Sequence, residues 1–310
     1  MGSSLANLTL FHHRVGRGLV SIVVLALASA ASYGIAAVLQ HREAVKAVPS
    51  QAGSSGLVAR LVRQPIWLLG SAFDVLGYLF QFLALRRGSL ALVEPLLVLS
   101  LVFALLAGAW LEHRPVSRSE MGAASVTSAG LAIFLVIARP GIGAPNASSA
   151  DWAGLSALIA GMCGLLALAA RRGTPQRAAL LYSAGSGIAF GYVAAVTERT
   201  GHILNGGALH TLATWPPYAL VAGAVVALVL TQSAFHAGIL RLSLPTLTIA
   251  QPLVALAIGL GFFGERVDSR WPAVTLEIVG VAMMTVGVYA LARSPVITAP
   301  KETGPKETPG

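Results

Sequence analysis

Charged residues are scarce in this chain. Lys, Arg, Asp and Glu make up 11% of its 310 residues, whereas about 25% is usual in soluble proteins. Hydrophobic residues make up 55% and occur in long uninterrupted blocks rather than in an amphipathic pattern. This composition excludes an ordinary soluble domain and predicts an integral membrane protein whose main partner is the lipid bilayer.

Cysteine and acidic residues are also few. The single cysteine, Cys163, excludes an intramolecular disulfide and a CxxC site. The 12 acidic and 21 basic residues give a formal net charge of +9, but the basic residues lie in short segments between apolar blocks. They form no continuous basic stripe, so nucleic acid is not an expected partner. The positive-inside rule accounts for them better.

Apolar blocks long enough to cross a bilayer occur along the whole chain. A helix rises about 1.5 Å per residue, so roughly 20 apolar residues span the hydrocarbon core. The predicted spans are residues 18–40, 66–86, 89–111, 119–139, 152–171, 177–198, 217–239, 244–264 and 271–292. The blocks do not alternate as strands of a membrane barrel would. We therefore expect an all-α membrane protein of about nine transmembrane helices.

The distribution of basic residues predicts the orientation of these spans. Of the 21 Lys and Arg residues, 8 fall on the side of the N-terminus and 13 on the other side. This excess places the N-terminus, residues 1–17, outside the plasma (inner) membrane and the C-terminus in the cytoplasm. Residues 293–310 are expected to form a disordered cytoplasmic tail. A cleaved signal peptide is an alternative for the first span, but its apolar run is long for that role.

The chain contains an internal repeat. Gln81 precedes a span that carries Glu94-Pro95, and His236 precedes a later span that carries Gln251-Pro252. The repeat predicts a 4+1+4 arrangement, with repeat 1 at 18–139, a connecting span at 152–171 and repeat 2 at 177–292. In the order of crossings the first span corresponds to the sixth, so one runs inward and the other outward. The two halves therefore have opposite topology. Inverted repeats of this kind favour alternating access.

Acidic residues inside predicted spans are candidates for function. A charge in hydrocarbon is costly unless it is paired or hydrated, and Asp74, Glu94 and Glu277 all lie within spans. Asp74, Tyr78 and Gln81 recur at i, i+4 and i+7, which places them on one helical face. Hydrogen bonds that hold helices together are the structural alternative for this polar stripe.

The second half carries counterparts of these residues. His236 aligns with Gln81, Gln232 lies beside it, and Pro95 and Pro252 interrupt equivalent spans. Proline removes a backbone donor, so paired interruptions indicate either a central substrate site or kinks that shape packing. Glu112 with Arg114 and Glu265 with Arg266 close equivalent spans, as solvated helix ends or interfacial anchors. The small residues Gly161, Gly164, Gly187 and Gly191 are expected to permit close helix contacts.

These features resemble a known group of membrane proteins. A short span, a polar residue before proline in the next span, a closing Glu with a nearby Arg, and the Gly-rich span from Gly122 to Gly130 are similar to the drug/metabolite transporter (EamA-like) superfamily. The Trp67 and Gly70 opening, Asp74, and the segment Val93-Glu94-Pro95-Leu96 resemble its NIPA-like branch. That resemblance implies transport of Mg²⁺ as a substrate, with Asp74 and Glu94 as candidate metal ligands.

The sequence predicts a secondary transporter that works by alternating access on a small cation, either Mg²⁺ or an organic amine or metabolite. An acid in the path would bind a proton or a cation competitively. No enzyme motif, Walker motif or cofactor fingerprint occurs, so we expect neither an enzyme nor a cofactor. A lipid or lipid-linked carrier flippase, a non-transporting scaffold and a homodimer are left open. The predicted pathway comprises Asp74, Tyr78, Gln81, Glu94, Pro95, Gln232, His236, Gln251, Pro252 and Glu277.

Overall fold

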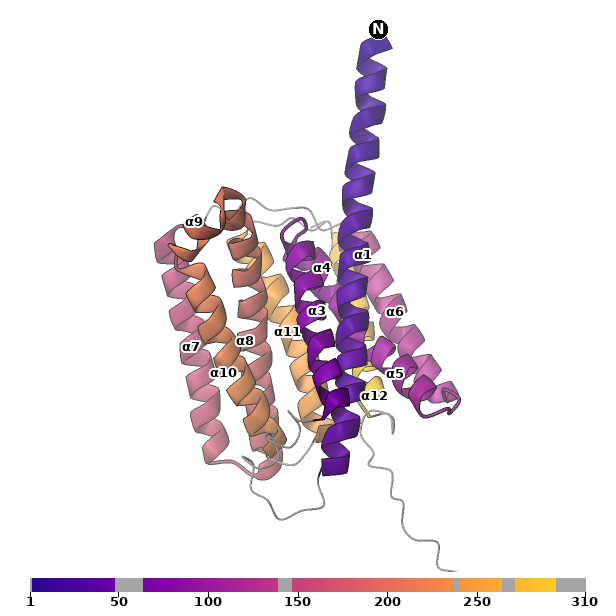
Figure 1. Cartoon of the computed structure of the whole chain (residues 1–310), viewed down its shortest axis with the longest axis vertical. Helices are drawn as coiled ribbons and strands as arrows, with labels where there is room; N and C mark the ends of the chain where they lie inside the picture. Colours follow the sequence, from indigo (N-terminus) through magenta and orange to yellow (C-terminus); the bar gives the residue numbers. More distant parts are fainter. Residues whose placement is uncertain (1, 48–63, 139–146, 237–239, 264–270, 294–310) are drawn as a thin grey trace, which may run out of the picture.

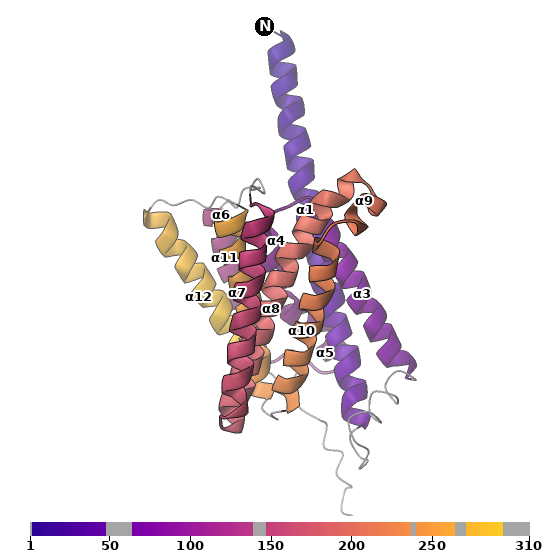
Figure 2. The ribbon, with the colours of Figure 1, turned by 90° about the vertical axis from the view of Figure 1, so that its left-hand side faces the viewer.

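The structure is a computed structural model of the whole chain, and it describes residues 2–47, 64–138, 147–236, 240–263 and 271–293. Within these residues every regular element is a helix, and the helices run roughly side by side along one direction (Figures 1 and 2). In chain order they are α1 (Gly2–Ala47), α3 (Pro65–Leu85), α4 (Leu90–Leu97), α5 (Ser100–Leu111), α6 (Arg118–Ala138), α7 (Ser149–Arg171), α8 (Pro175–Ile203), the 3₁₀ turn η1 (Leu204–Gly206), α9 (Ala208–Leu212), α10 (Pro216–His236), α11 (Leu240–Phe262) and α12 (Trp271–Leu291).

Local sequence signals set the starts of several helices. The Ser148 side chain accepts a hydrogen bond of 3.2 Å from the Asp151 amide, and the Asp151 carboxylate accepts one of 2.7 Å from the Ser148 amide. This capping box satisfies two amides that the start of α7 leaves without helical partners. Helices α3 and α8 begin with Pro65 and Pro175. A proline is tolerated at the first position because its missing amide would have no partner there.

The described residues confirm a multi-pass helical membrane protein. Eight helices are long and apolar enough to cross a bilayer, and a shorter apolar stretch, Thr246–Phe262, lies in α11. This stretch falls within the span predicted at 244–264. The total of nine spans and the 4+1+4 arrangement stay predictions, and the predicted tail after Arg293 lies outside the described residues.

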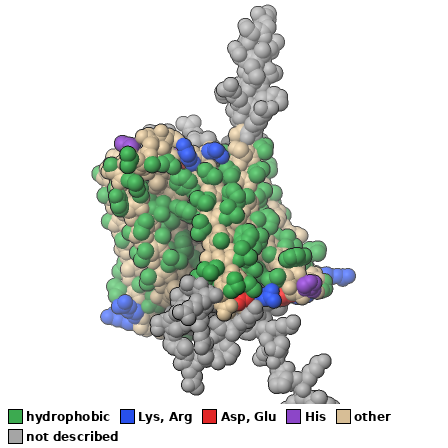
Figure 3. Space-filling model, viewed as in Figure 1, with side chains coloured by type: hydrophobic (Ala, Val, Ile, Leu, Met, Phe, Trp, Pro, Cys, Tyr) green, Lys and Arg blue, Asp and Glu red, His purple; other side chains and the backbone are tan. Residues whose placement is uncertain are grey.

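The outward faces of the helices are apolar. On α10, for example, Val221, Val225 and Val229 are all more than half exposed, and their spacing of four places them on one face of the helix. Figure 3 shows hydrophobic side chains over the middle of the molecule, with the Lys and Arg side chains of this view near its two ends. An exposed apolar band of this kind is stable in lipid and would be unfavourable in water.

The third predicted span is two helices rather than one. Between α4 and α5, the amides of Val98, Leu99 and Leu101 each donate to the carbonyl three residues earlier, at 3.2 to 3.3 Å. These tighter bonds follow Pro95, which lacks the amide that a regular helix would use. Helix α11, by contrast, continues through Pro252. The interruption predicted for both halves therefore occurs as a helix break in the first half alone.

Helices α4 and α8 form the interior. All eight residues of α4 are buried, as is most of α8 from Gly185 to Glu198. Helix α1 packs on α3, α4 and α5, while α8 packs on α7, α10 and α11, and α4 also contacts α8 and α11. Figure 2 shows α8 between α7 and α10. The first and second halves of the chain therefore meet at α4, α8 and α11, and also where α6 packs on α12.

Glycines allow the closest of these contacts. A β-carbon on Gly187 would lie 2.5 Å from the Ala250 side chain, and one on Gly191 would lie 2.8 Å from the Gln251 carbonyl oxygen. The prediction of close helix contact is therefore confirmed for these two glycines. It is wrong for Gly161 and Gly164, which have open space around them because they lie on the exposed side of α7.

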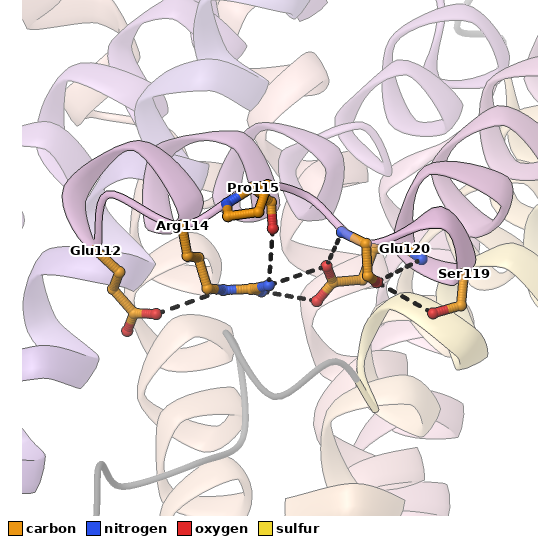
Figure 4. Close-up of polar contacts among 6 residues, drawn as sticks. Glu112, Arg114, Pro115, Ser119 and Glu120 are labelled. Carbon is orange, nitrogen blue, oxygen red and sulfur yellow. Dashed lines mark hydrogen bonds and ion pairs between the residues drawn. The ribbon is translucent and has the colours of Figure 1, made fainter.

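An ion-pair cluster joins α5 to α6 at one end of the bundle (Figure 4). Arg114 donates to both carboxylate oxygens of the buried Glu120, at 2.7 and 3.2 Å, and lies 3.5 Å from the exposed Glu112. The hydrogen bond to Glu120 raises the pKa of the Arg114 guanidinium above its ordinary value. Arg114 is therefore held mainly by Glu120, which the sequence analysis did not single out. Glu265 and Arg266 lie outside the described residues.

Candidate functional site

A buried carboxylate occupies the junction of the two halves. Glu94 lies in the second turn of α4 and is 1% exposed. The Gln81 side-chain amide donates to Glu94 Oε1 at 2.9 Å, and the Gln251 side-chain amide donates to Glu94 Oε2 at 3.1 Å. Gln81 comes from α3 and Gln251 from α11, so the acid connects the first half of the chain to the second.

The surroundings of Glu94 are polar but carry no compensating cation. Both of its hydrogen-bond partners are neutral amides, and among the described residues no Lys or Arg forms an ion pair with it. A buried charge is expensive unless it is paired. A proton or a bound cation would therefore neutralise Glu94 at little cost, and this exchange is the chemistry that the site can perform.

Tyr33 extends the network from α1. Its hydroxyl donates to Gln81 Oε1 at 2.8 Å, which fixes the Gln81 amide so that its NH₂ group faces Glu94. Tyr33 also interacts electrostatically with both Glu94 and Asp74. The sequence analysis missed Tyr33, because a tyrosine in an apolar span gives no distinctive signal until its partner is known.

Asp74 lies in a separate part of the polar stripe. The Gln40 side-chain amide donates to Asp74 Oδ2 at 2.5 Å, and Asp74 is half-buried. Gln81 follows Asp74 by seven residues, which corresponds to about 10 Å along a helix. Asp74 and Glu94 therefore have different partners, and the described residues contain no cluster of three His, Cys, Asp or Glu that would hold a metal ion. Metal binding by either acid stays a prediction.

Tyr78 joins the same stripe to α8. Its hydroxyl shares a hydrogen bond of 3.3 Å with Thr197 Oγ1. Asp74 and Tyr78 therefore each make one contact to another helix, and Gln81 makes two, to Tyr33 and to Glu94. The partners Gln40 and Thr197 could not be identified from sequence, because they lie 34 and 119 residues away from Asp74 and Tyr78.

Gln232, the predicted counterpart on α10 whose side chain the structure describes, lies apart from this network. Gln232 is exposed, because the buried face of α10 carries Ala227, Leu230 and Ala234 and Gln232 points the opposite way. Gln232 therefore faces away from the Glu94 network, and its place in a pathway stays a prediction. His236 ends α10, and its side chain lies outside the described residues. In the second half, Gln251 of α11 is the residue that reaches the site.

Pro95 and Pro252 line a pocket beside the Glu94 network. The pocket lies between α4, α6, α11 and α12 and is partly open to the surroundings, and its space together with that of its open mouth is about 400 Å³. Apart from two threonines, its lining is apolar: Pro95, Val98, Phe134, Thr248, Ile249, Pro252, Leu253, Leu256, Val281, Met284, Thr285 and Val288. The two prolines therefore do converge on one place, as the repeat predicts, but that place is apolar.

Glu277 lies near this pocket without lining it. It is half-buried on α12 and precedes the lining residue Val281 by four positions, so both lie on the same side of that helix. Glu94 contacts Gln81 from the first half of the chain and Gln251 from the second, whereas Gln40, which binds Asp74, lies in the first half.

A further acid was missed by the sequence analysis. Glu198 on α8 is almost fully buried, and its carboxylate interacts with His202 and with Glu94. Glu198 is the last residue of the span predicted at 177–198 and precedes Arg199. In the structure α8 continues to Ile203, so Glu198 lies inside the helix and not at its end.

Comparison with known proteins places the chain in a family. It is 30% identical over 282 residues to an uncharacterized protein of Corynebacterium glutamicum, and the match covers 90% of this chain and 96% of that protein. The chain belongs to the family of that protein. No family model matches the chain, and no solved structure matches it. Because the relative is matched over nearly its whole length, the similarity extends across both halves of the bundle and includes the segments that carry Glu94 and Gln251.

Proposed function

We propose that this protein is a secondary transporter that exchanges a small cation, Mg²⁺ or an organic amine, across the membrane by alternating access. One observation carries the proposal: Glu94, an unpaired buried acid in a membrane-spanning helix, is held by Gln81 from one half of the chain and by Gln251 from the other. A rocking motion between the halves would change the contacts of the acid, and with them its affinity for a cation.

The packing of the helices supports two related halves. Helix α1 packs on α3 and α5 in the first half, and α8 packs on α10 and α11 at the equivalent places in the second. The closest glycine contacts also correspond, since a β-carbon on Gly34 would lie 2.6 Å from the Ser100 carbonyl oxygen of α5, and Gly187 and Gly191 face the α11 backbone. This correspondence favours the 4+1+4 inverted repeat and the proposed membership of the drug/metabolite transporter superfamily.

The chemistry of Glu94 favours a cation that it can bind directly. Mg²⁺ prefers oxygen ligands and gives up its waters reluctantly, and the site offers one carboxylate among neutral amides and a phenol. An organic amine needs fewer ligands, and its apolar part would contact the pocket beside Pro95. The absence of a Walker motif from the sequence leaves an ion gradient or the substrate's own gradient as the driving force.

Reconstituted vesicles test the proposal. We would measure uptake of Mg²⁺ and of tetraethylammonium, whose permanent charge prevents passive crossing, by the wild type, Glu94→Gln and the control Glu112→Gln. Glu112 is 57% exposed and lies at a helix end. We expect the wild type to transport at least one probe, Glu94→Gln to lose about tenfold or more of that flux, and the control to stay within about twofold. Equal flux in wild-type and empty vesicles, or in wild type and Glu94→Gln, contradicts the proposal.

The pocket favours a second candidate, movement of a lipid or lipid-linked carrier. Its apolar lining and partial opening between helices suit a hydrocarbon chain better than a free ion. Met284→Trp would fill the pocket, which it lines, without touching the hydrogen bonds of Glu94. If the protein is a lipid flippase, Met284→Trp abolishes transfer of a fluorescent phospholipid between leaflets. If it is a cation transporter, this variant retains most of the flux that Glu94→Gln loses.

A further inference from the structure

Glu198 is a second buried acid at the interface between the halves. Its side chain is 2% exposed, and it accepts a hydrogen bond from the Leu90 amide at the start of α4. Glu198 Oε2 has no hydrogen-bond partner among the described residues, and neither has the buried hydroxyl of Ser89, the residue before Leu90. A buried carboxylate oxygen without a partner is costly as an anion, but a bound proton would remove that cost.

His202 connects this acid to the surface. His202 Nε2 lies 3.7 Å from Glu198 Oε1, one helical turn away on α8, and its side chain is 30% exposed. At the same end of α8, Arg86 donates to the Asn205 side chain at 2.6 and 3.2 Å. The imidazole therefore lies between the rim of the bundle and its interior, and histidine is the side chain best suited to exchange protons near neutral pH.

The electrostatic partners of Glu198 form a short set. They are His202 on the same helix, the Leu90 amide, and Glu94 on α4; no charged side chain from the described parts of α3, α7, α10 or α11 is among them. Arg199 follows Glu198 directly, and adjacent residues on a helix point about 100° apart. Glu94 follows Leu90, whose amide Glu198 binds, by about one turn of α4, and it is the acid that interacts electrostatically with Glu198.

We propose that His202 and Glu198 form a proton-binding relay that serves Glu94. The inference rests on the proposed function, because it assigns the coupling ion of the same site. A proton from water binds the His202 imidazole and then passes to the Glu198 carboxylate, directly or through one water, as the N–H bond breaks and an O–H bond forms. From Glu198 it passes to Glu94 when the cation leaves. One proton thus takes the place of each cation that leaves Glu94, and His202 returns to its neutral form.

A purely structural role for Glu198 makes a different prediction. The Leu90 amide is one of the first amides of α4, so Glu198 caps that helix from α8. Glu198→Gln keeps an amide oxygen that accepts the same hydrogen bond, but it cannot bind the proton. A capping residue would therefore tolerate this change, whereas a proton carrier would not.

Proton flux separates the two roles. In vesicles that contain a pH-sensitive dye, we would drive Mg²⁺ or tetraethylammonium out of the lumen and record proton uptake by wild type, Glu198→Gln, His202→Gln and the control His210→Gln. His210 is exposed on α9 at the same end of the bundle. We expect Glu198→Gln to lose about tenfold or more of the coupled proton flux while it keeps cation-for-cation exchange, and His202→Gln to slow proton entry several-fold. Unchanged coupling in Glu198→Gln overturns the inference.

Infrared difference spectra recorded during a pH jump give a readout that does not depend on transport. The carboxylic acid band of the folded wild type should lose one component in Glu198→Gln and a different one in Glu94→Gln. The wild type could transport neither probe and still show the Glu198 component, and His202→Gln could slow the appearance of that component. The proposed function would then fail and the proton relay would stand. If the Glu198 component is absent, the relay is wrong whatever the transport result.

Discussion

Gly130 of α6 and Gly280 of α12 face each other in a reciprocal contact. A β-carbon on Gly130 would lie 2.6 Å from the Gly280 carbonyl oxygen and 2.7 Å from the Met284 amide, and one on Gly280 would lie 2.8 Å from the Gly130 carbonyl oxygen and 3.0 Å from the Phe134 amide. Met284 and Phe134 each follow their glycine by four residues. Equivalent atoms thus meet on the two helices, which is the contact expected where a two-fold axis passes between repeats.

This contact predicts that Gly130→Ala weakens the fold. Alanine favours a helix by about 1 kcal/mol over glycine, but here its methyl group overlaps the backbone of α12 at 2.6 Å. Overpacking of this kind costs about 1–3 kcal/mol, and a backbone cannot move aside as a flexible side chain can. We expect a net loss of up to about 2 kcal/mol, seen as a lower midpoint of thermal unfolding in detergent.

Gly122→Ala is the matched control, because it lies on the same helix and has nothing within 4 Å of its added β-carbon. Its melting temperature should stay the same or rise. If Gly130→Ala and Gly122→Ala melt together, the close approach of α6 and α12 is absent in the protein.

The two glutamines that bind Glu94 predict a second effect on stability. Gln251→Met removes the donor to Glu94 Oε2 and leaves the acid with one amide partner. The loss of a hydrogen bond to a buried charged group costs about 1.5–3 kcal/mol. The exposed Gln232→Met, on α10, should change the melting temperature little. A double substitution at Gln81 and Gln251 measures their coupling through Glu94, and strictly additive losses would show that the two amides do not share the carboxylate.

Part of the fold and of the site could be predicted from the sequence. The stripe of Asp74, Tyr78 and Gln81 could be predicted, whereas the partners of Glu94 could not. The spans follow from the lengths of apolar blocks, and the stripe on α3 follows from helical spacing, because both are local properties of the chain. The Glu94–Gln251 bond joins residues 157 positions apart, and no local pattern determines such a distance. Glu198 was missed for a related reason: its burial depends on how far α8 extends and on which helices cover it.

Gly77 tests the position of Tyr33. A β-carbon on Gly77 would lie 2.9 to 3.2 Å from atoms of the Tyr33 ring, so Gly77→Ala pushes the ring away from α3. The Tyr33 hydroxyl would then lose its contact with Gln81, and the Gln81 amide would no longer be fixed toward Glu94. We expect cation flux to fall about tenfold, with a smaller loss in stability of about 1 kcal/mol. Gly161→Ala, which meets open space, should transport at the wild-type rate.

The Arg114 cluster predicts a pH profile. Its hydrogen bond with Glu120 raises the pKa of Arg114, so the stability gained from this shift is fully present below the ordinary pKa of arginine and is lost as pH rises through the higher folded value. Arg114→Gln should therefore lower the free energy of unfolding by about 2 kcal/mol. Because Arg114 stays charged between pH 6 and pH 9, the difference in free energy of unfolding between wild type and variant should stay constant over this range. Chemical unfolding in detergent at several pH values measures this, and a difference that changes steeply in this range would contradict the assignment.

The positions of the chain ends predict membrane topology. Helix α1 begins at one end of the bundle and α12 finishes at the other (Figure 1), as an odd number of crossings requires. The connection from α7 to α8, with Arg171, Arg172 and Arg177, lies at the end where α12 finishes, and positive charge favours the cytoplasm.

We expect a fluorescent protein fused after residue 310 to be folded inside the cell and an epitope before residue 1 to be labelled from outside intact cells. An epitope inserted after Gly173 is the internal control and should be labelled only after the cells are permeabilised. If both ends report the same side, the number of crossings is even, and the opposite orientation of the halves, on which the exchange of contacts at Glu94 depends, is lost.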